Sequence, residues 1–521
     1  MKIELYDTTL RDGAQTEGIS YSVNDKINIA KKMDELGIQY IEGGWPGANP
    51  KDSEFFEKIK KIKLKNSEVV SFCSTRHPKK KIFYDINIRK VLEAETKTIT
   101  IFGKSWDLHV REVLKSSLED NLKLIQDTVR YLKTKNRKVI YDAEHFFDGY
   151  KANPEYALKT ILIAQDAGVD TIVLCDTNGG SLPDDIFETI KNIKDKIRVI
   201  LGIHTHNDLG LAVANSLVAL KAGCTHIQGT FNNLGERCGN ADLCTIIGIL
   251  KLKMGINCIS DAALKNLTAT SHYISEISNI KPQDNQPFVG RSAFAHKAGV
   301  HIDAMLKHPQ TYEHIDPSLV GNHRRFLISE LSGKSSIVTM AKEIELELDK
   351  RSPQTRRIFK LLQELEHKGY QFEAADASFK LLLNKELKRI KKFFELEGFR
   401  VIVEKRADER VFAEATIRLK VKGKEQYMAA EGDGPVNALD NALRKALIEF
   451  YPALSRMHLS DFKVRVLDEK AGTAAKVRVL IQSQDDKDIW NTVGVSENII
   501  EASWQALVDS IEYKLWKDKT D

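Results

Sequence analysis

Cysteine is scarce in this sequence, and its placement excludes two kinds of site. Six of the 521 residues are cysteines, and no two of them form a Cys-x-x-Cys pair. This excludes a zinc site built on such pairs. The scattered thiols also give no disulfide framework of the kind that small secreted proteins carry, so we expect reduced cysteines and a cytoplasmic location.

The sequence also lacks long apolar runs and an excess of one charge. No apolar run is long enough to span a bilayer, and residues 1–5 lead straight into a strand pattern, not a signal peptide. The 78 basic and 73 acidic residues are interspersed, which leaves no large basic face. We therefore predict that neither a membrane nor a nucleic acid is a partner. The chain is long enough for two or three domains with cores of their own.

Apolar and amphipathic segments alternate along the first half of the chain. Short apolar stretches typical of buried strands are separated by stretches with helical spacing, several of which end in glycine. Eight such units indicate an α/β fold of the (β/α)8 TIM barrel type. A doubly wound open sheet is the alternative, but no Gly-x-Gly-x-x-Gly motif follows the first strand. The expected strands are residues 2–7, 40–45, 68–73, 98–102, 138–143, 171–175, 198–204 and 225–229.

The pattern changes twice after the barrel. Residues 276–396 combine helical pieces with a polar linker, and we interpret them as a helical accessory region. Residues 397–521 turn to strand patterns and hold two similar units, each with paired strands, a turn glycine (Gly432 or Gly494) and a helix. The sequence thus predicts three parts: a barrel over residues 1–275, an accessory region over 276–396, and an α+β domain with a duplicated βββα-like unit over 397–521.

Two histidines end the seventh expected strand. Side chains two apart on a strand point to the same face, so His204 and His206 would present their imidazoles side by side. Imidazole suits zinc, manganese, cobalt or nickel better than calcium. The alternative is a pair of histidines that are simply hydrogen-bonded in a loop.

Other polar residues gather at the carboxyl ends of the expected strands, which form the catalytic face of a TIM barrel. Asp12 follows the first strand and Asn240 follows the eighth. Closure of the barrel makes strands seven, eight and one neighbours, so both side chains are expected to converge with the two histidines on one divalent metal cation. The alternative for Asp12 is a structural ion pair with Arg11.

Several motifs resemble one enzyme family along nearly the whole chain. Residues 7–15 (DTTLRDGAQ), 204–208 (HTHND) and 235–240 (GERCGN) are similar to the signatures of the metal-dependent acyltransferases that include 2-isopropylmalate, homocitrate and citramalate synthases. Residues 294–301 (FAHKAGVH) and 311–313 (TYE) resemble the accessory-domain motif of this family. Residues 42–47 (EGGWPG) and 102–109 (FGKSWDLH) are most similar to its citramalate synthase branch.

The resemblance implies a reaction, cofactors and partners. The reaction would be the condensation of acetyl-CoA, the co-substrate, with the 2-keto acid pyruvate, followed by thioester hydrolysis to (R)-citramalate and CoA, a step toward isoleucine. It implies a divalent metal (Mn, Mg, Co or Zn), a regulatory C-terminal domain that responds to isoleucine as effector, and a homodimer. It also implies that His301, assisted by Tyr312, is the catalytic base that enolises acetyl-CoA.

The implied reaction gives residues of the barrel expected roles. Arg11 is always charged and would stabilise the alkoxide that develops on the keto acid. Thr177 would donate a hydrogen bond to the substrate carboxylate, and Glu144 would orient substrate or water. Gln15, the last residue of the first motif, is expected to bind substrate as well.

Bulky residues follow strands two, four and five, toward which the side chain of the keto acid would project. Trp45, Phe102, Trp106 and Phe146 would leave room for a methyl group and exclude a branched chain, which favours pyruvate over 2-oxoisovalerate. We expect Phe102 to line the substrate pocket, with Trp106 as the alternative.

Three other functions remain open from the sequence. One is a 2-isopropylmalate or homocitrate synthase, which would differ only in the keto acid. Another is a lyase or biotin-dependent carboxyltransferase on the same barrel, although no Met-Lys-Met-type biotin segment is present. The last is a purely regulatory protein, which the polar strand ends make unfavourable.

Overall fold

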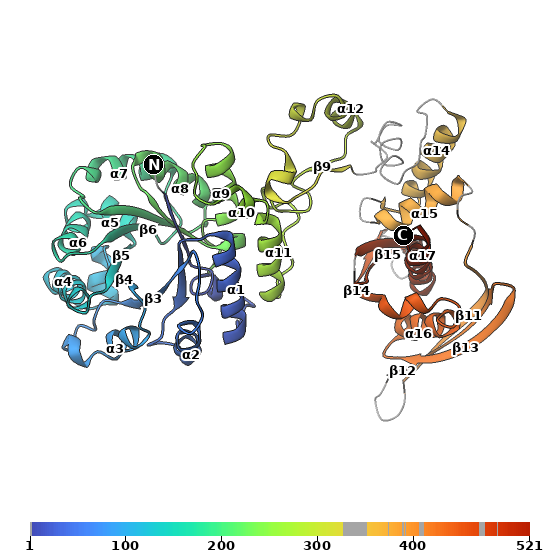
Figure 1. Cartoon of the computed structure of the whole chain (residues 1–521), viewed down its shortest axis with the longest axis horizontal. Coiled ribbons are helices and arrows are strands. Elements are labelled where there is room, and N and C mark those ends of the chain that lie inside the picture. Colours follow the sequence, from blue (N-terminus) through green and yellow to red (C-terminus); the bar gives the residue numbers. More distant parts are fainter. Residues whose placement is uncertain are drawn as a thin grey trace. The chain divides into compact units, whose positions relative to one another are not determined.

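The computed structural model divides into two compact units (Figure 1). The first comprises Met1–Phe294 and Ile315–Arg324, and the second comprises Ala295–His314 and Arg325–Asp521. The residues that the structure describes are 3–326, 352–372, 375–387, 390, 392–405, 411–467, 475–486 and 488–520.

The first unit is a closed barrel of eight parallel strands, which confirms the predicted fold class. The strands are β1 (Glu4–Asp7), β2 (Tyr40–Gly44), β3 (Glu68–Ser74), β4 (Thr98–Lys104), β5 (Lys138–Glu144), β6 (Thr171–Asp176), β7 (Ile200–Thr205) and β8 (His226–Gly229). They follow one another around the barrel in chain order, and β8 closes the ring by pairing with β1. Asp7 lies opposite Gly229 in this last pairing, so the carboxyl ends of the first and last strands are neighbours.

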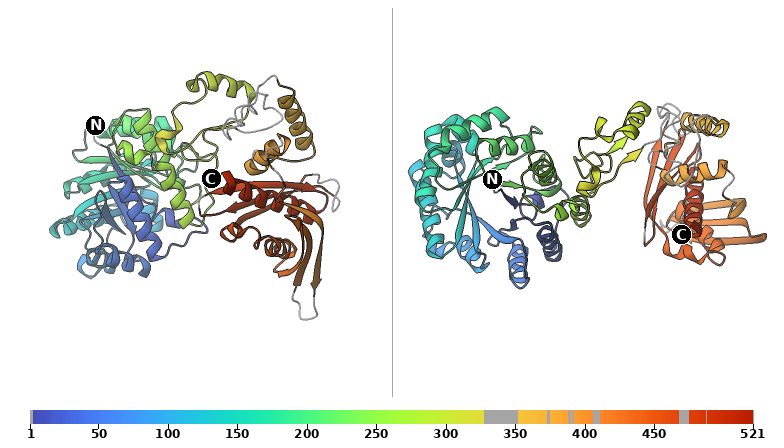
Figure 2. Two further views of the ribbon diagram at one scale, coloured as in Figure 1. Left: turned by 45° about the vertical axis from the view of Figure 1, so that its right-hand side comes forward. Right: turned by 45° about the horizontal axis from the view of Figure 1, so that its top comes forward.

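Helices surround the strands, as both views in Figure 2 show. Local signals set their ends. In the first helix, the Ser22 side chain accepts a hydrogen bond from the Asp25 N–H, the Asp25 side chain accepts one from the Ser22 N–H, and Gly37 ends the helix at φ 89°. The helices between the strands are α1 (Val23–Leu36), α2 (Pro50–Ile59), α3 (Ile86–Glu93), α4 (Leu118–Thr134), α5 (Phe146–Ala152), α6 (Pro154–Asp166), α7 (Pro183–Lys194) and α8 (Ala212–Ala222).

Side chains fill the barrel interior, so the barrel is a packed core and not a pore. Inward-facing residues alternate along the strands and form one buried cluster, which comprises Tyr6, Tyr40, Val70, Ile140, Val173 and Cys175. A larger apolar cluster lies between the strands and the helices. Because side chains fill the interior of the barrel, a substrate site has to lie at an end of the barrel.

Three helices follow the barrel within the first unit: α9 (Leu243–Leu252), α10 (Asp261–Leu264) and α11 (Leu267–Ile277). Helix α11 packs on α1, and the Tyr21 hydroxyl lies 2.8 Å from Ser278 Oγ just after α11. The chain therefore returns to the start of the barrel where the predicted accessory region begins. The predicted division at residues 275 and 396 stays a prediction.

The second unit contains the duplicated fold predicted for the C-terminal part. Strands β11 (Phe394–Lys405), β12 (Val411–Val421) and β13 (Lys424–Gly432) form one antiparallel sheet, followed by α16 (Pro435–Leu447). Strands β14 (His458–Val466), β15 (Val477–Gln484) and β16 (Ile489–Ser496) form another, followed by α17 (Ile499–Thr520). The sheets and their helices are visible in orange and red in Figure 1. The two halves of this domain therefore share the element order βββα.

The repeated glycines have a packing reason. A Cβ atom on Gly432 would collide with the backbone N of Ala438 in α16. A Cβ atom on Gly494 would collide with the backbone O of Ala502 in α17. Each glycine therefore lets a strand pass close to the helix of its own unit.

Further elements of the second unit precede these sheets. They are β9 (Ala295–His296), α12 (Gly299–Lys307), β10 (Arg325–Phe326), α14 (Pro353–His367) and α15 (Asp376–Glu386). Ile358 and Phe379 of α14 and α15 belong to the same buried cluster as Val493 of β16, so these helices are part of the C-terminal core. Among the described residues, no helix has both the length and the apolar character needed to cross a membrane.

Candidate active site

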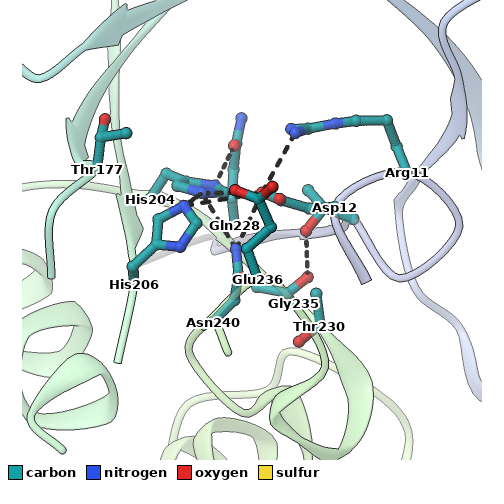
Figure 3. Close-up of polar contacts among 12 residues, drawn as sticks. Arg11, Asp12, Thr177, His204, His206, Gln228, Thr230, Gly235, Glu236 and Asn240 are labelled. Carbon is teal, nitrogen blue, oxygen red and sulfur yellow. Dashed lines mark hydrogen bonds and ion pairs between the residues drawn. The ribbon is translucent and has the colours of Figure 1, made fainter. Parts of the chain in front are cut away.

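Strand β7 presents His204 and His206 together, as their spacing predicts. Both rings are buried, and their Nε2 atoms lie 3.4 Å apart (Figure 3). His204 also places Nδ1 2.9 Å from Oε1 of Gln228, the residue opposite it on β8. The two rings therefore turn their Nε2 atoms toward one point at the carboxyl end of the barrel.

Asp12 and Asn240 meet the histidines there. Asp12 Oδ2 lies 3.3 Å from His204 Nε2 and 4.0 Å from His206 Nε2. Asn240 Nδ2 lies 3.0 Å from Asp12 Oδ2 and 3.2 Å from His204 Nε2. Residues that are more than 190 positions apart in the chain are thus brought together by the closure of β8 on β1.

The loop that carries Asn240 requires glycine at two positions. Gly235 has φ 149°, and a Cβ atom there would collide with the Asn240 side-chain oxygen. Gly239 has φ 84°, and a Cβ atom there would collide with the carbonyl of Asn233. An isolated bridge also pairs Asn240 with His206. The tight loop therefore places the amide of Asn240 beside Asp12, His204 and His206.

These four residues fit a divalent cation. Asp12, His204 and His206 each offer one ligand atom, and all three atoms lie within 4.8 Å of one another. Oδ1 of Asn240 is buried without a hydrogen-bond partner in the described part of the protein. Rotation of this amide would bring Oδ1 beside Asp12 and His204 as a further ligand. Two imidazoles, a carboxylate and an amide oxygen are typical of manganese, cobalt or zinc and are compatible with magnesium.

The electrostatics of the cluster suit a cation. Burial by itself would raise the pKa of Asp12, but the neighbouring Arg11 and a hydrogen bond from His204 hold that pKa well below its usual range. Burial, reinforced by the charge of His204, lowers the pKa of His206 to about 3. The site thus offers an ionised carboxylate and at least one neutral imidazole near pH 7, which are the forms that bind a metal.

A cavity of about 230 Å³ opens above this cluster. Arg11, Gln15, Phe102, Glu144 and Thr177, for which the sequence predicted roles, all line it. The complete lining is Arg11, Asp12, Gln15, Trp45, Phe72, Phe102, Asp142, Glu144, Cys175, Thr177, His204, His206, Glu236 and Arg237. Residues expected to bind substrate and residues that fit a metal therefore share one cavity.

Hydrogen bonds fix the polar residues of this cavity. The Thr177 hydroxyl accepts a hydrogen bond of 2.9 Å from the His145 N–H, which leaves its own proton free to donate. Lys104 forms an ion pair with Glu144. Arg237 donates to both oxygens of Asp208, at 2.7 and 2.9 Å, and to the Thr177 carbonyl at 2.7 Å. Arg237 thereby ties together the loops after β6, β7 and β8.

Two unlike walls bound the cavity. The polar wall consists of Arg11, Asp12, His204 and His206. The aromatic wall consists of Trp45, Phe72 and Phe102, from the ends of β2, β3 and β4. Trp45 meets both phenylalanines edge to face, with ring centroids 5.9 and 5.6 Å apart, and the two phenylalanines stack at 5.3 Å.

Two aromatic residues predicted to bound the pocket lie elsewhere. Trp106 stacks on His109, with ring centroids 5.4 Å apart, and does not line the cavity. Phe146 is fully buried and packs against Phe147 and Tyr150. Of the alternatives that the sequence left open, Phe102 lines the cavity and Trp106 does not.

His301 and Tyr312 belong to the second compact unit. Their rings stack with centroids 4.1 Å apart. The Tyr312 side chain is exposed within its unit. The two rings are therefore in contact, and the role of His301 as catalytic base, assisted by Tyr312, stays a prediction.

Three buried polar residues beside the site had no role in the sequence-based prediction. Glu42 accepts hydrogen bonds of 2.5 Å from both the Tyr6 hydroxyl and Arg11 Nε. Burial and the charge of Glu42 raise the pKa of Asp142 to about 7. Gln228 links Asp142 to His204. Strand parity could have identified them, because it predicts that these polar side chains point into the barrel. A polar group buried there must be paired or functional.

Comparison with known proteins agrees with this geometry. The HMGL-like family matches residues 2–274, a homocitrate synthase post-HMGL domain-like family matches 288–369, and the LeuA allosteric (dimerisation) domain matches 373–515. The chain is 55% identical to the (R)-citramalate synthase of Geobacter sulfurreducens, over 99% of this chain and 98% of that protein. It is 53% identical to the (R)-citramalate synthase of Aquifex aeolicus, over 100% and 99% of the two chains.

A third relative shows where the similarity declines. The 2-isopropylmalate synthase of Methanocaldococcus jannaschii is 32% identical over 99% of this chain and 95% of that protein. Both kinds of relative span the barrel, the accessory segment and the C-terminal domain, so the difference lies in identity and not in architecture. The resemblance seen in the motifs is confirmed, and the chain belongs to the (R)-citramalate synthase family of HMGL-like proteins with a LeuA allosteric (dimerisation) domain.

Proposed function

We propose that this protein is a metal-dependent (R)-citramalate synthase. It condenses acetyl-CoA with pyruvate and hydrolyses the resulting thioester, which releases (R)-citramalate and CoA and supplies a step toward isoleucine. The observation that carries this proposal is the full-length identity of 46–55% to proteins named (R)-citramalate synthase. Identity to the 2-isopropylmalate synthases falls to 31–32%, so that alternative is not favoured.

Asp12, His204, His206 and Asn240 would hold the divalent metal, which is manganese, magnesium, cobalt or zinc. When bound, the metal supplies Lewis acidity that polarises the ketone of the keto acid. The support is the convergence of three ligand atoms within 4.8 Å and the unpartnered amide oxygen beside them.

Arg11 and Thr177 would bind and orient the keto acid. The Arg11 guanidinium lies 4.0 Å above the Phe72 ring and 3.3 Å from Asp12, so its charge stands at the mouth of the ligand cluster. There it stabilises the negative charge that develops on the ketone oxygen during carbon–carbon bond formation. The Thr177 hydroxyl donates its free proton to the substrate carboxylate, and Gln15 supplies a second polar contact.

Enolisation of acetyl-CoA needs a base within reach of its methyl group. His301, assisted by Tyr312, accepts a proton from the acetyl methyl group, and the resulting carbon nucleophile attacks the ketone carbon of pyruvate. The alkoxide oxygen then takes up a proton from water, and His301 releases the proton that it accepted to solvent. Glu144, which forms an ion pair with Lys104, orients water toward the thioester carbonyl. Hydrolysis expels CoA as the thiol and makes the sequence irreversible.

The aromatic wall would determine which keto acid is used. Trp45, Phe72 and Phe102 form a continuous surface of rings, which leaves space for the methyl group of pyruvate. One extra methylene changes binding in an apolar pocket by only about 1–3 kcal/mol, so steric exclusion must supply much of the selectivity. Phe102 is the residue of this wall that we assign to substrate binding.

The second unit would regulate the enzyme. The LeuA allosteric (dimerisation) domain accounts for residues 373–515, which supports dimer formation and allosteric control. We assign isoleucine as the effector, a homodimer as the assembly and the cytoplasm as the location. Sedimentation equilibrium of the full chain with and without isoleucine tests the first two assignments, because binding at a dimer-forming domain should alter either the association constant or the activity.

One assay tests the reaction. Release of CoA from acetyl-CoA is followed with a thiol reagent across pyruvate, 2-oxobutanoate, 2-oxoisovalerate and 2-oxoglutarate, with and without added metal. We expect turnover with pyruvate that disappears after chelation and returns with Mn²⁺. Equal or better efficiency with 2-oxoisovalerate would contradict the citramalate assignment and favour a 2-isopropylmalate synthase.

A further inference from the structure

Gln228 lies between the ligand cluster and a buried carboxylate. It is fully buried on β8, directly opposite His204 on β7. Its Oε1 lies 2.9 Å from His204 Nδ1, and its Nε2 donates a hydrogen bond of 3.1 Å to Asp142 Oδ1. Figure 3 shows the amide beside the His204 ring, on the side away from Asn240. Gln228 touches no ligand atom, because it contacts the nitrogen of His204 that faces away from Asp12.

The two nitrogens of His204 have different tasks. Nε2 faces the other ligands, at 3.3 Å from Asp12 Oδ2, and must carry a lone pair to bind a metal. The proton of the neutral ring must then reside on Nδ1. A proton there needs an acceptor within hydrogen-bond distance, because a buried unpaired N–H is costly. Gln228 Oε1 is that acceptor.

An amide alone does not fix the tautomer of a histidine. Gln228 could turn by 180° and offer its NH₂ group, which would favour a proton on Nε2 and block the ligand position. Above its pKa of about 7, Asp142 prevents this rotation, because an ionised carboxylate only accepts hydrogen bonds and therefore holds the NH₂ end. The Asp142–Gln228 pair thus transmits a fixed orientation from β5 to the ring on β7.

We propose that Gln228, held by Asp142, is a positioning residue that keeps His204 in the tautomer that binds the metal. This inference rests on the metal site of the proposed function and extends it to two residues outside the ligand set. It assigns no contact with substrate to Gln228. Loss of a group that accepts a hydrogen bond from the non-ligating nitrogen of a metal-binding histidine commonly changes metal affinity by about 10–100-fold.

The first test is metal affinity of the full-length protein. Protein stripped with a chelator is titrated with Mn²⁺ alone at pH 8 in a calorimeter. We expect Gln228→Leu to weaken Mn²⁺ binding about 10–100-fold, because it removes the acceptor for Nδ1. Binding within threefold of the unmodified protein would overturn the proposal.

A matched variant separates positioning from stability. Gln165 is also buried, and its amide also makes two hydrogen bonds, with the Lys196 carbonyl and the Arg198 N–H. Gln165→Leu removes an equivalent amide far from the ligands. We expect it to lower the melting temperature as Gln228→Leu does but to leave Mn²⁺ affinity unchanged. Equal loss of affinity in both variants would mean that the effect is general destabilisation, and would overturn the proposal.

An exchange of acid and amide gives a rescue test. Gln228→Glu alone sets a second buried carboxylate against Asp142 and is expected to weaken binding. In Asp142→Asn/Gln228→Glu the amide at 142 donates to the carboxylate at 228, which accepts from His204 Nδ1. We expect this exchange to restore Mn²⁺ affinity to within threefold of the unmodified protein. Failure of rescue in a folded double variant would show that hydrogen-bond direction is not what matters.

The design also distinguishes this inference from the proposed metal site. If His204→Ala leaves Mn²⁺ binding intact, the metal site itself is wrong and this inference is overturned with it. If His204→Ala abolishes binding while Gln228→Leu and Asp142→Asn do not weaken it, the site stands and only the positioning role is overturned.

Discussion

The two walls of the cavity are built in different ways. The polar wall is held by directional contacts of defined length, such as the 3.3 Å separation of His204 Nε2 and Asp12 Oδ2. The aromatic wall is held by ring contacts of 5.3–5.9 Å between centroids, which constrain shape more than direction. Substitutions in the polar wall should therefore abolish catalytic activity. Changes in the aromatic wall should instead alter which substrate fits.

Arg11, a member of the polar wall, also contacts the aromatic wall. Arg11 forms ion pairs with Asp12 and Glu42, and its guanidinium also lies over the Phe72 ring. The cation stands between the carboxylates and an aromatic face, so its position depends on both walls. The substrate carbonyl and its side chain would meet at this boundary.

The largest effect is expected from the polar wall. His206→Ala should remove the bound metal and lower kcat/KM by at least about 10³-fold, since the site loses one of its ligands. Metal content by mass spectrometry and steady-state kinetics measure this. His226→Gln, which alters a buried barrel histidine away from the cavity, should retain the metal. Full metal content in His206→Ala would rule out the ligand set.

Arg11 sharpens the comparison at the boundary of the walls. Arg11→Gln should lower kcat by about 10²–10³-fold, because one charge that stabilises the alkoxide is lost. Arg11→Lys keeps the charge, but its single nitrogen cannot contact Glu42 and Asp12 as separate guanidinium nitrogens do. Its kcat should therefore lie between that of the unmodified protein and that of Arg11→Gln. Metal content should stay near that of the unmodified protein. Unchanged kcat in Arg11→Gln would show that this cation has no role in the chemistry.

Substitutions in the aromatic wall should change which keto acid the enzyme prefers. Phe102→Ala should shift the ratio of kcat/KM for 2-oxoisovalerate over pyruvate by about tenfold toward the larger acid, because it opens space beside Trp45. Phe146→Ala removes a buried ring that does not line the cavity, and serves as the control. It should lower stability by about 3–5 kcal/mol without a change in the ratio. An equal shift in both variants would contradict the assignment of the wall.

The smallest effect concerns the floor of the cavity, where Asp142 lies. Its pKa is raised to about 7 in the folded protein from an ordinary value of 3.8. Between these pH values the folded state holds a proton that the unfolded state has released, so this group lowers stability as the pH rises, by at most about 1.4 kcal/mol per unit. Above about pH 7 the contribution is constant.

Asp142→Asn tests whether this carboxyl group lowers the stability of the folded protein as the pH rises. The variant keeps an oxygen that can accept from Gln228 but has no proton to lose. Melting temperatures of the metal-free proteins at pH 5, 6, 7 and 8 should show the variant gaining stability relative to the unmodified protein up to about pH 7. A constant difference across this range would mean that Asp142 does not titrate there.

The amino-acid sequence by itself determined the barrel and predicted which residues would hold the metal. Eight apolar stretches at βα spacing are local signals, because each strand is buried on both faces and each helix on one. His204 and His206 share a face through strand parity alone, and parity does not depend on the rest of the fold. Asp12 and Asn240 follow from barrel closure, which the strand count dictates. Gly432 and Gly494 revealed the duplication for the same local reason.

Only the tertiary structure decided which side chains line the cavity. Trp106 and Phe102 lie four residues apart, yet only Phe102 faces the cavity, because Trp106 follows the end of β4 and stacks on His109. Strand parity places Gln228 and Asp142 inside the barrel but does not say which groups they contact. Only the closed barrel brings their strands, which are distant in sequence, close enough for the hydrogen bond between them. Periodicity fixes which face of a strand is buried. The partner that a buried polar group finds there depends on neighbours supplied by the closed barrel.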